Sequence, residues 1–180
     1  MTNEMKSILE RLKLVDYLTT EIPIAKKDFV EKLKMNVDPG DIGIFLSAFE
    51  VFSRSKNEYK GIITSESFKI RRRRKFFDMN MSFAVAEGGL KQRENLLIIE
   101  STIKAFSGIF IPFIAFLLTI YIALTITFIF SDSLGNMGWF FAPFIFIHAS
   151  IMLGIPYFIM RRSVSRMKYE LERDFYYLAK

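Results

Sequence analysis

Two long stretches without a charged side chain most constrain what this 180-residue chain can fold into. Residues 105–131 and 133–160 contain no Asp, Glu, Lys or Arg. An α-helix needs about 20 apolar residues to cross the ~30 Å hydrocarbon layer of a bilayer. A chain of this length has no core large enough to bury two such helices. The sequence therefore predicts a transmembrane hairpin over 105–160, with spans at about 106–130 and 139–160.

The distribution of charge predicts the orientation of this hairpin. Residues 1–104 hold 19 Lys and Arg against 15 Asp and Glu, and residues 161–180 hold 6 against 3. The connecting segment 131–138 has no Lys or Arg. Basic residues flanking membrane spans stay on the cytoplasmic side. We therefore expect both termini to be cytoplasmic.

Residues 1–104 have the pattern of a small cytosolic α+β domain. Alternating and β-branched residues indicate strands, and apolar residues spaced three to four apart indicate helices. The segment 42–56 is compatible with either. The expected helices cover 4–12 and 25–38, and the expected strands cover 13–24, 58–64, 68–77, 82–89 and 94–106.

Consecutive short strands joined by tight turns predict an antiparallel meander with one face on a small core. The tail 161–180 reads as a separate, short amphipathic helix. Its apolar side would be formed by Val164, Met167, Leu171, Phe175 and Leu178. The expected fold class is thus α+β: a β-rich cytosolic domain, a two-helix membrane hairpin and a short C-terminal helix.

A dense basic segment lies within the expected strand 68–77. Six of the seven residues from 69 to 75 are cationic: Lys69, Arg71, Arg72, Arg73, Arg74 and Lys75. Alternate residues of a strand face opposite sides, so Lys69, Arg71, Arg73 and Lys75 would form a row spaced about 7 Å apart. Arg72 and Arg74 would share the other face with apolar residues. Those two must reach an acid, a lipid headgroup or solvent, because an unpaired buried charge is too costly. Neighbouring strands offer Glu87, Glu94 and Glu100 as acidic partners.

Three interpretations of the basic segment remain open. It can be a solvated or salt-bridged strand without a ligand. It can bind the headgroups of an anionic leaflet, which attract basic residues by about 1 kcal/mol each. It can also bind a soluble phosphate-bearing ligand such as a nucleotide or oligonucleotide, since arginine binds phosphate bidentately and nearby aromatic rings can stack on bases.

The order of these features carries a resemblance. The segments "YKGI" and "FKIRRR", followed by a hairpin, two spans and a charged helix, resemble a group of uncharacterised bacterial two-span membrane proteins over residues 58–175. The plan of a small basic domain on a compact membrane module is also similar to nucleotide- or oligonucleotide-controlled effectors of antiphage defence. These resemblances imply a bacterial inner-membrane protein, and they transfer no residue roles.

No pattern of catalytic or cofactor-binding residues accompanies this architecture. The chain has no cysteine and a single histidine, His148, so a thiolate site or a centre built on several histidines is excluded. Paired carboxylates, a nucleophile with its base and a phosphate-binding glycine loop are not recognisable. We expect no enzymatic activity, metal or cofactor.

Small and hydroxylated residues recur every four positions in the first span, at Ala115, Thr119, Ala123 and Thr127. The second span carries a similar pair, Ser150 and Gly154. Such stripes allow close helix packing in lipid, either within the hairpin or between subunits around a pore. Two helices cannot enclose a channel, so a channel requires a homo-oligomer. His148 would form a hydrogen bond between helices or take part in gating or proton relay, and the first role is the more common one.

The sequence favours an oligomeric membrane effector or ion channel, regulated by a phosphate-bearing ligand on the basic cytosolic domain. The alternative is a non-conducting membrane-anchored protein whose basic domain binds lipid headgroups or a partner subunit.

Overall fold

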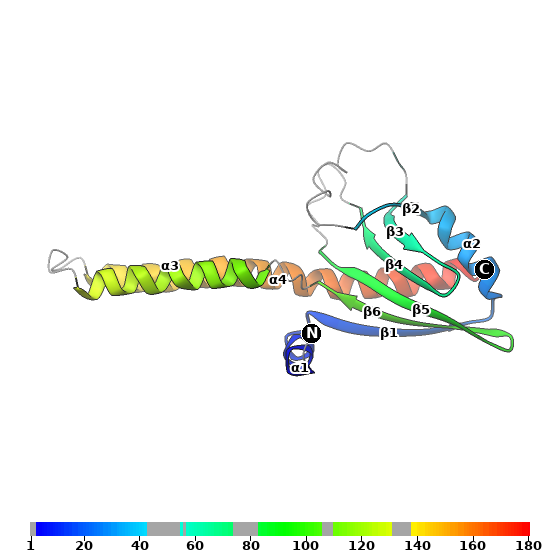
Figure 1. Cartoon of the computed structure of the whole chain (residues 1–180), viewed down its shortest axis with the longest axis horizontal. Coiled ribbons are helices and arrows are strands. Elements are labelled where there is room, and N and C mark those ends of the chain that lie inside the picture. The colour runs from blue at the N-terminus through cyan, green and yellow to red at the C-terminus, as the bar shows by residue number, and fades with distance from the viewer. Residues whose placement is uncertain (1–2, 43–54, 56, 74–82, 106–109, 131–137) are drawn as a thin grey trace. The chain divides into compact units, whose positions relative to one another are not determined.

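The computed structural model of the chain contains two compact units (Figure 1). The first comprises Met1–Phe106 with Ile159–Lys180, and the second comprises Ser107–Phe158. The structure describes residues 3–42, 55, 57–73, 83–105, 110–130 and 138–180.

The first unit is built on a six-stranded sheet with the order β1-β6-β5-β4-β3-β2 (Figure 1). The strands are β1 (Val15–Ile22), β2 (Val37–Pro39), β3 (Tyr59–Ile63), β4 (Ser67–Arg72), β5 (Val85–Arg93) and β6 (Leu96–Lys104). Strands β3 to β6 pair antiparallel in chain order, which confirms the predicted meander, and β1 pairs antiparallel with β6. The alternation of apolar and polar residues does not predict β2, because this strand has only three residues, too few to show a period. Strand β2 runs parallel to β3.

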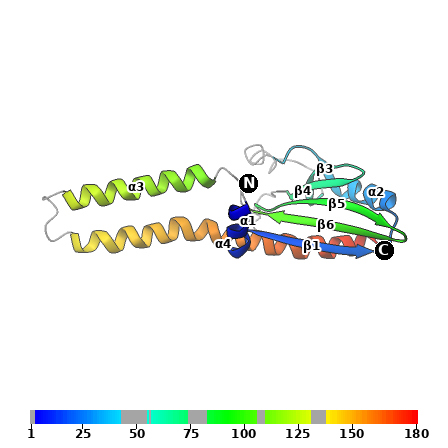
Figure 2. The ribbon, with the colours of Figure 1, turned by 60° about the horizontal axis from the view of Figure 1, so that its bottom comes forward.

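Helix α1 (Asn3–Arg11) precedes β1, and α2 (Lys26–Asn36) follows it. One face of the sheet is covered by α2 and by the last part of α4 (Figure 2). Phe175 of α4 lies at the centre of this core, and its ring centroid is 5.6 Å from that of Phe29 and 5.7 Å from that of Phe68. Gly88 on β5 makes room for Phe68, because a Cβ there would lie 2.4 Å from the Phe68 ring.

Helix α4 (Gly138–Leu178) is continuous over 41 residues. The expected separate C-terminal helix over 161–180 is therefore wrong: it is the last part of the helix that contains the second candidate span. The physical reason is local, since no Gly or Pro follows Pro156 to end the helix. The expected apolar side is confirmed for Val164, Met167, Leu171 and Phe175, which are all buried.

The second unit contains α3 (Phe110–Phe130) and the beginning of α4, up to Phe158. Helix α3 has 21 residues, so it is about 32 Å long. Both helices are long and apolar enough to cross a membrane. Many of their large apolar side chains are exposed, a surface that a soluble monomer rarely presents. The residues that join the helices, 131–137, lie outside the described part of the chain.

Candidate functional site

The described part of the basic segment (residues 69–75) is residues 69–73, and it lies on and directly after β4, an inner strand of the sheet. Its first members belong to β4, and Arg73 follows the last residue of that strand. Two members of the predicted set lie outside the described residues: Arg74 and Lys75. The described cations Lys69, Arg71, Arg72 and Arg73 therefore define the candidate site.

Lys69 faces Glu87, its register partner on the neighbouring strand β5. The Lys69 Nζ lies 2.8 Å from Glu87 Oε1, and the Lys104 Nζ lies 3.0 Å from Glu87 Oε2. The hydrogen bond from Lys69, joined by that from Lys104, lowers the pKa of the Glu87 carboxyl below its usual value. Glu87 stays ionised, so an anion can bind Lys69 only in competition with it.

Arg72 points to the other face of the sheet and binds α4. Its Nη1 donates to Glu170 Oε1, and the Nε of Arg166 donates to the same oxygen at 2.7 Å. Glu170 is 8% exposed. The acids on neighbouring strands that the sequence offered as partners for Arg72 are wrong, because its partner Glu170 lies on α4. The pairing of Glu87 with Lys69 shows why, since Glu87 lies on the opposite face.

Arg73 binds the edge of the sheet at β2. Its Nη1 donates to Asp38 Oδ2. The other oxygen of Asp38 accepts hydrogen bonds from Ser55 Oγ at 2.9 Å and from Asn57 Nδ2 at 2.8 Å. Asp38 therefore joins the end of the basic segment to β2 and to the residues preceding β3.

The expected row of exposed cations is not present among the described residues. Arg71 and Arg73 are each 6% exposed, whereas the Lys69 side chain is 49% exposed. Lys69, Arg72 and Arg73 each have a carboxylate partner, and Arg71 also interacts with other groups of the chain. The salt-bridged arrangement that the sequence left open thus describes these side chains.

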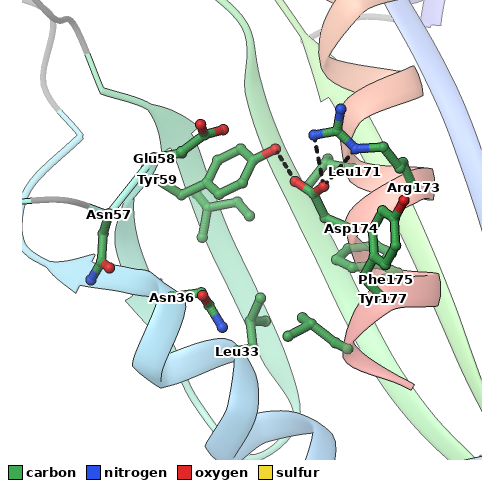
Figure 3. Close-up of a pocket in the computed structure, with 12 residues that line it drawn as sticks. Leu33, Asn36, Asn57, Glu58, Tyr59, Leu171, Arg173, Asp174, Phe175 and Tyr177 are labelled. Carbon is green, nitrogen blue, oxygen red and sulfur yellow. Dashed lines mark hydrogen bonds and ion pairs between the residues drawn. The ribbon is translucent and has the colours of Figure 1, made fainter. Parts of the chain in front are cut away.

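A second polar contact links the same part of the sheet to α4. Tyr59, the register partner of Arg72, donates a hydrogen bond from its hydroxyl to Asp174 Oδ2 at 2.7 Å (Figure 3). Burial, together with the hydrogen bond to Asp174, raises the pKa of the Tyr59 phenol well above its usual value. Asp174 lies one helical turn after Glu170. We call the four residues Tyr59, Arg72, Glu170 and Asp174 the α4 clamp.

The clamp consists of two neighbours on the sheet and two neighbours on one helix face. The sequence alone does not reveal the clamp. Arg72 and Glu170 are 98 positions apart, and Tyr59 and Asp174 are 115 positions apart, so only the packing of α4 on the sheet brings each pair into contact. One pattern in the sequence does point to the clamp. Glu170 and Asp174 are four residues apart, so they lie on one face of the helix, and each directly precedes a buried apolar residue, Leu171 and Phe175.

The small-residue stripe of α3 lies away from α4. Ala115, Thr119, Ala123 and Thr127 are all exposed, and the two threonine hydroxyls donate to carbonyls four residues earlier, each at 2.9 Å. Tyr121, two residues or about 200° of rotation after Thr119, hydrogen-bonds α4 instead. Packing of this stripe within the helix pair, which the sequence left open, is therefore not observed.

The small residues expected to pack in the second span, Ser150 and Gly154, also make no tight contact between helices. Ser150 is exposed and its hydroxyl donates to the Phe146 carbonyl at 2.7 Å. A Cβ added at Gly154 would meet nothing within 4 Å. Neither residue brings α3 and α4 close together.

His148 has the expected role of a link between the two helices. Its Nδ1 lies 2.8 Å from the Tyr121 hydroxyl, and its ring stacks on Phe144 with a centroid distance of 6.0 Å. Among the residues that the structure describes, no group of three or more His, Cys, Asp or Glu side chains could hold a metal ion.

Comparisons with known proteins add no relative: no family model matches the chain, and no curated protein or solved structure shows significant similarity to it. Function must therefore be argued from the site itself.

Proposed function

We propose that this chain is an oligomeric integral membrane effector or ion channel, regulated by a phosphate-bearing ligand at the basic segment of its cytosolic domain. The α4 clamp supports this proposal. It attaches β4, which carries the basic segment, to the helix that begins as the second candidate span. A ligand that changes the clamp therefore acts on a helix that continues into the membrane segment.

Competition for the cations is the proposed mechanism. A phosphate group can replace a carboxylate on an arginine, because both accept two parallel hydrogen bonds from the guanidinium. Lys69 and Arg72 lie on opposite faces of the sheet, so each binds phosphate separately. At Lys69 the phosphate displaces Glu87, and at Arg72 it displaces Glu170. Loss of this ion pair weakens the attachment of α4 to the sheet. Because carboxylates must be displaced, we expect modest affinity and strong dependence on salt.

Anion binding tests the proposal. We expect detergent-purified protein to bind a fluorescein-labelled oligoadenylate at low salt, and the Lys69→Gln/Arg72→Gln variant to bind at least tenfold more weakly. The slope of log affinity against log salt should flatten by roughly 0.7 per lost phosphate contact for a single-stranded ligand. Fluorescence anisotropy across a salt series measures both quantities.

Lys91→Gln is the matched control, because Lys91 is an exposed lysine of the same sheet that pairs with Glu100 at 2.7 Å. The control should retain wild-type binding. Wild-type protein without saturable binding, or equal weakening in the control, would show that the basic segment is not a site for soluble phosphates.

The alternative function is a non-conducting membrane-anchored protein whose basic domain binds headgroups or a partner subunit. The carboxylate partners of Lys69, Arg72 and Arg73 favour its partner-subunit form, since paired cations bind phosphates, whether soluble or in headgroups, less readily. The two functions differ in conductance. Liposomes carrying the protein should show ion flux that responds to oligoadenylate under the first proposal and no flux under the second.

Location and orientation belong to the proposal. We propose that both termini are cytoplasmic, because of the charge asymmetry given above. The resemblances given above support a bacterial inner membrane, and they are the only support for a role in antiphage defence. A cysteine at Ser133 should react with an impermeant thiol reagent added outside spheroplasts, and a cysteine at Ser55 should react only after lysis. The reverse pattern would invert the topology.

A further inference from the structure

A cavity of about 340 Å³ opens in the first unit between α2, the start of β3 and the last turns of α4 (Figure 3). Its volume falls within the range of small-molecule sites, about 300 to 1,000 Å³. Apolar side chains from three elements form its inner wall: Leu33, Ile70, Leu171, Phe175 and Leu178. This wall can accept an aromatic or short aliphatic group.

The rim of the cavity carries more negative than positive charge. Glu58 and Asp174 contribute two carboxylates, and Arg173 contributes one guanidinium. Arg173 binds Asp174 from outside, with its Nη2 at 2.9 Å from Oδ1, and its side chain is 45% exposed. Lys32 binds the Leu178 carbonyl at 2.9 Å and does not line the cavity. The charge at the rim therefore favours a cationic group.

Two of the polar groups that line the cavity, the Tyr59 hydroxyl and the Asp174 carboxylate, can accept a further hydrogen bond. The Tyr59 hydroxyl donates a hydrogen bond to Asp174 Oδ2, so it presents lone pairs to any further partner. A carboxylate oxygen can accept two hydrogen bonds, which allows Oδ2 to accept another donor beside Tyr59. The ring of Tyr59, a lining residue, offers a π-face to a cation. The ring of Tyr177 already has the Lys180 Nζ over it, 5.7 Å from the ring centroid.

From this geometry we propose that the cavity binds a small organic cation, an amine on an aromatic or short aliphatic body. The ammonium group lies at Asp174 and the Tyr59 hydroxyl, and the body lies against Leu171 and Phe175. The site is separate from anion binding at the basic segment, so either can fail without the other. Because Asp174 and Tyr59 belong to the α4 clamp, such a ligand would also contact the clamp.

Three probes of similar shape test the charge preference: 2-phenylethylamine, 2-phenylethanol and phenylacetate. Saturation-transfer NMR on the detergent-purified full chain measures the affinity of each, with the same micelles in every sample. We expect the amine to bind at least tenfold more tightly than the alcohol, and the carboxylate to bind more weakly still. Equal affinities, or no saturable binding of the amine up to about 10 mM, would overturn the proposal.

Variants locate the binding. Asp174→Asn should weaken amine binding at least tenfold, whereas Glu172→Gln, an exposed acid of the same helix that does not line the cavity, should leave it unchanged. Asn36→Trp fills the rim from an exposed position of α2 outside the clamp, so it should block binding in a folded protein even if Asp174→Asn does not fold. Wild-type affinity in folded Asp174→Asn or in Asn36→Trp would place the amine elsewhere.

Discussion

Replacing Glu170 by glutamine should lower the free energy of unfolding of the first unit by about 3 kcal/mol, at the lower end of the range for breaking a buried ion pair. The carboxylate is nearly buried and is shared by Arg72 and Arg166, with side-chain exposures of 10%, 13% and 33% for the three residues. Removing its charge leaves two guanidinium groups without their counterion. Urea unfolding followed by far-UV circular dichroism measures the loss.

The reciprocal change should cost less. Arg72→Gln leaves Glu170 paired with Arg166 at 2.7 Å, so we expect a loss of about 1.5 kcal/mol. The apolar pair Arg72→Met with Glu170→Leu should recover part of the stability, since it removes the two most buried charges and leaves only Arg166, which is 33% exposed, without its partner. A double-mutant cycle with the single variants Arg72→Met and Glu170→Leu measures this recovery as a favourable coupling energy.

Lys91→Gln provides the control for an exposed pair, because the Lys91 and Glu100 side chains are 66% and 54% exposed. It should change stability by less than about 0.5 kcal/mol. A loss for Glu170→Gln as small as that of the control would mean that the clamp contributes little to holding α4 on the sheet.

Local patterns were sufficient to predict most of the first unit. The alternation in 94–106 matches β6 (Leu96–Lys104), whose inward residues Leu97, Ile99 and Ile103 are all buried. A strand with one buried face repeats apolar residues every second position, and a helix with one buried face repeats them every 3.6 positions on average. These periods can be seen in the sequence without knowing which segments touch. This is why the order of helices and strands could be read before any contact was known.

Contacts between distant segments could not be read in the same way. Arg72 had acids available on neighbouring strands, and its actual partner lies 98 residues away on α4. The choice depends on which face of the sheet the helix covers, and alternation alone does not identify that face. The charge pattern is compatible with a binding row and with a salt-bridged strand, and packing uses most of its described members as ion-pair partners.

The continuity of α4 was missed for a related reason. Arg161 and Arg162 mark the end of the apolar stretch, and a change from apolar to charged composition looks like an element boundary. The helix propensity of the residues does not fall at that change, because arginine is a good helix former and no Gly or Pro follows. The boundary is one of composition and not of backbone, so one helix carries both a candidate span and part of the core of the first unit.

The exposed stripe on α3 leads to the second large expected effect. Since Ala115, Thr119, Ala123 and Thr127 are exposed, close packing that covers this stripe requires another copy of the chain or lipid. Helix association in membranes depends on close van der Waals contact, because lipid provides no hydrophobic drive between apolar helices. The threonine hydroxyls are already bonded to their own helix, so contact at this stripe depends on small side chains rather than on polar pairing.

We therefore expect Thr119→Leu with Ala123→Leu to convert an oligomer in detergent to monomers, measured by size-exclusion chromatography with light scattering, and to abolish any ion flux in liposomes. Thr125→Leu is the matched control, since Thr125 is also exposed and bonded to a carbonyl four residues earlier, at 2.7 Å, but lies about 200° from Ala123. The control should keep the wild-type mass. An unchanged oligomer in the double variant would move the subunit contact to another face of α3 or to α4. A monomeric wild type would remove the channel from the proposed function, because one pair of helices encloses no pore.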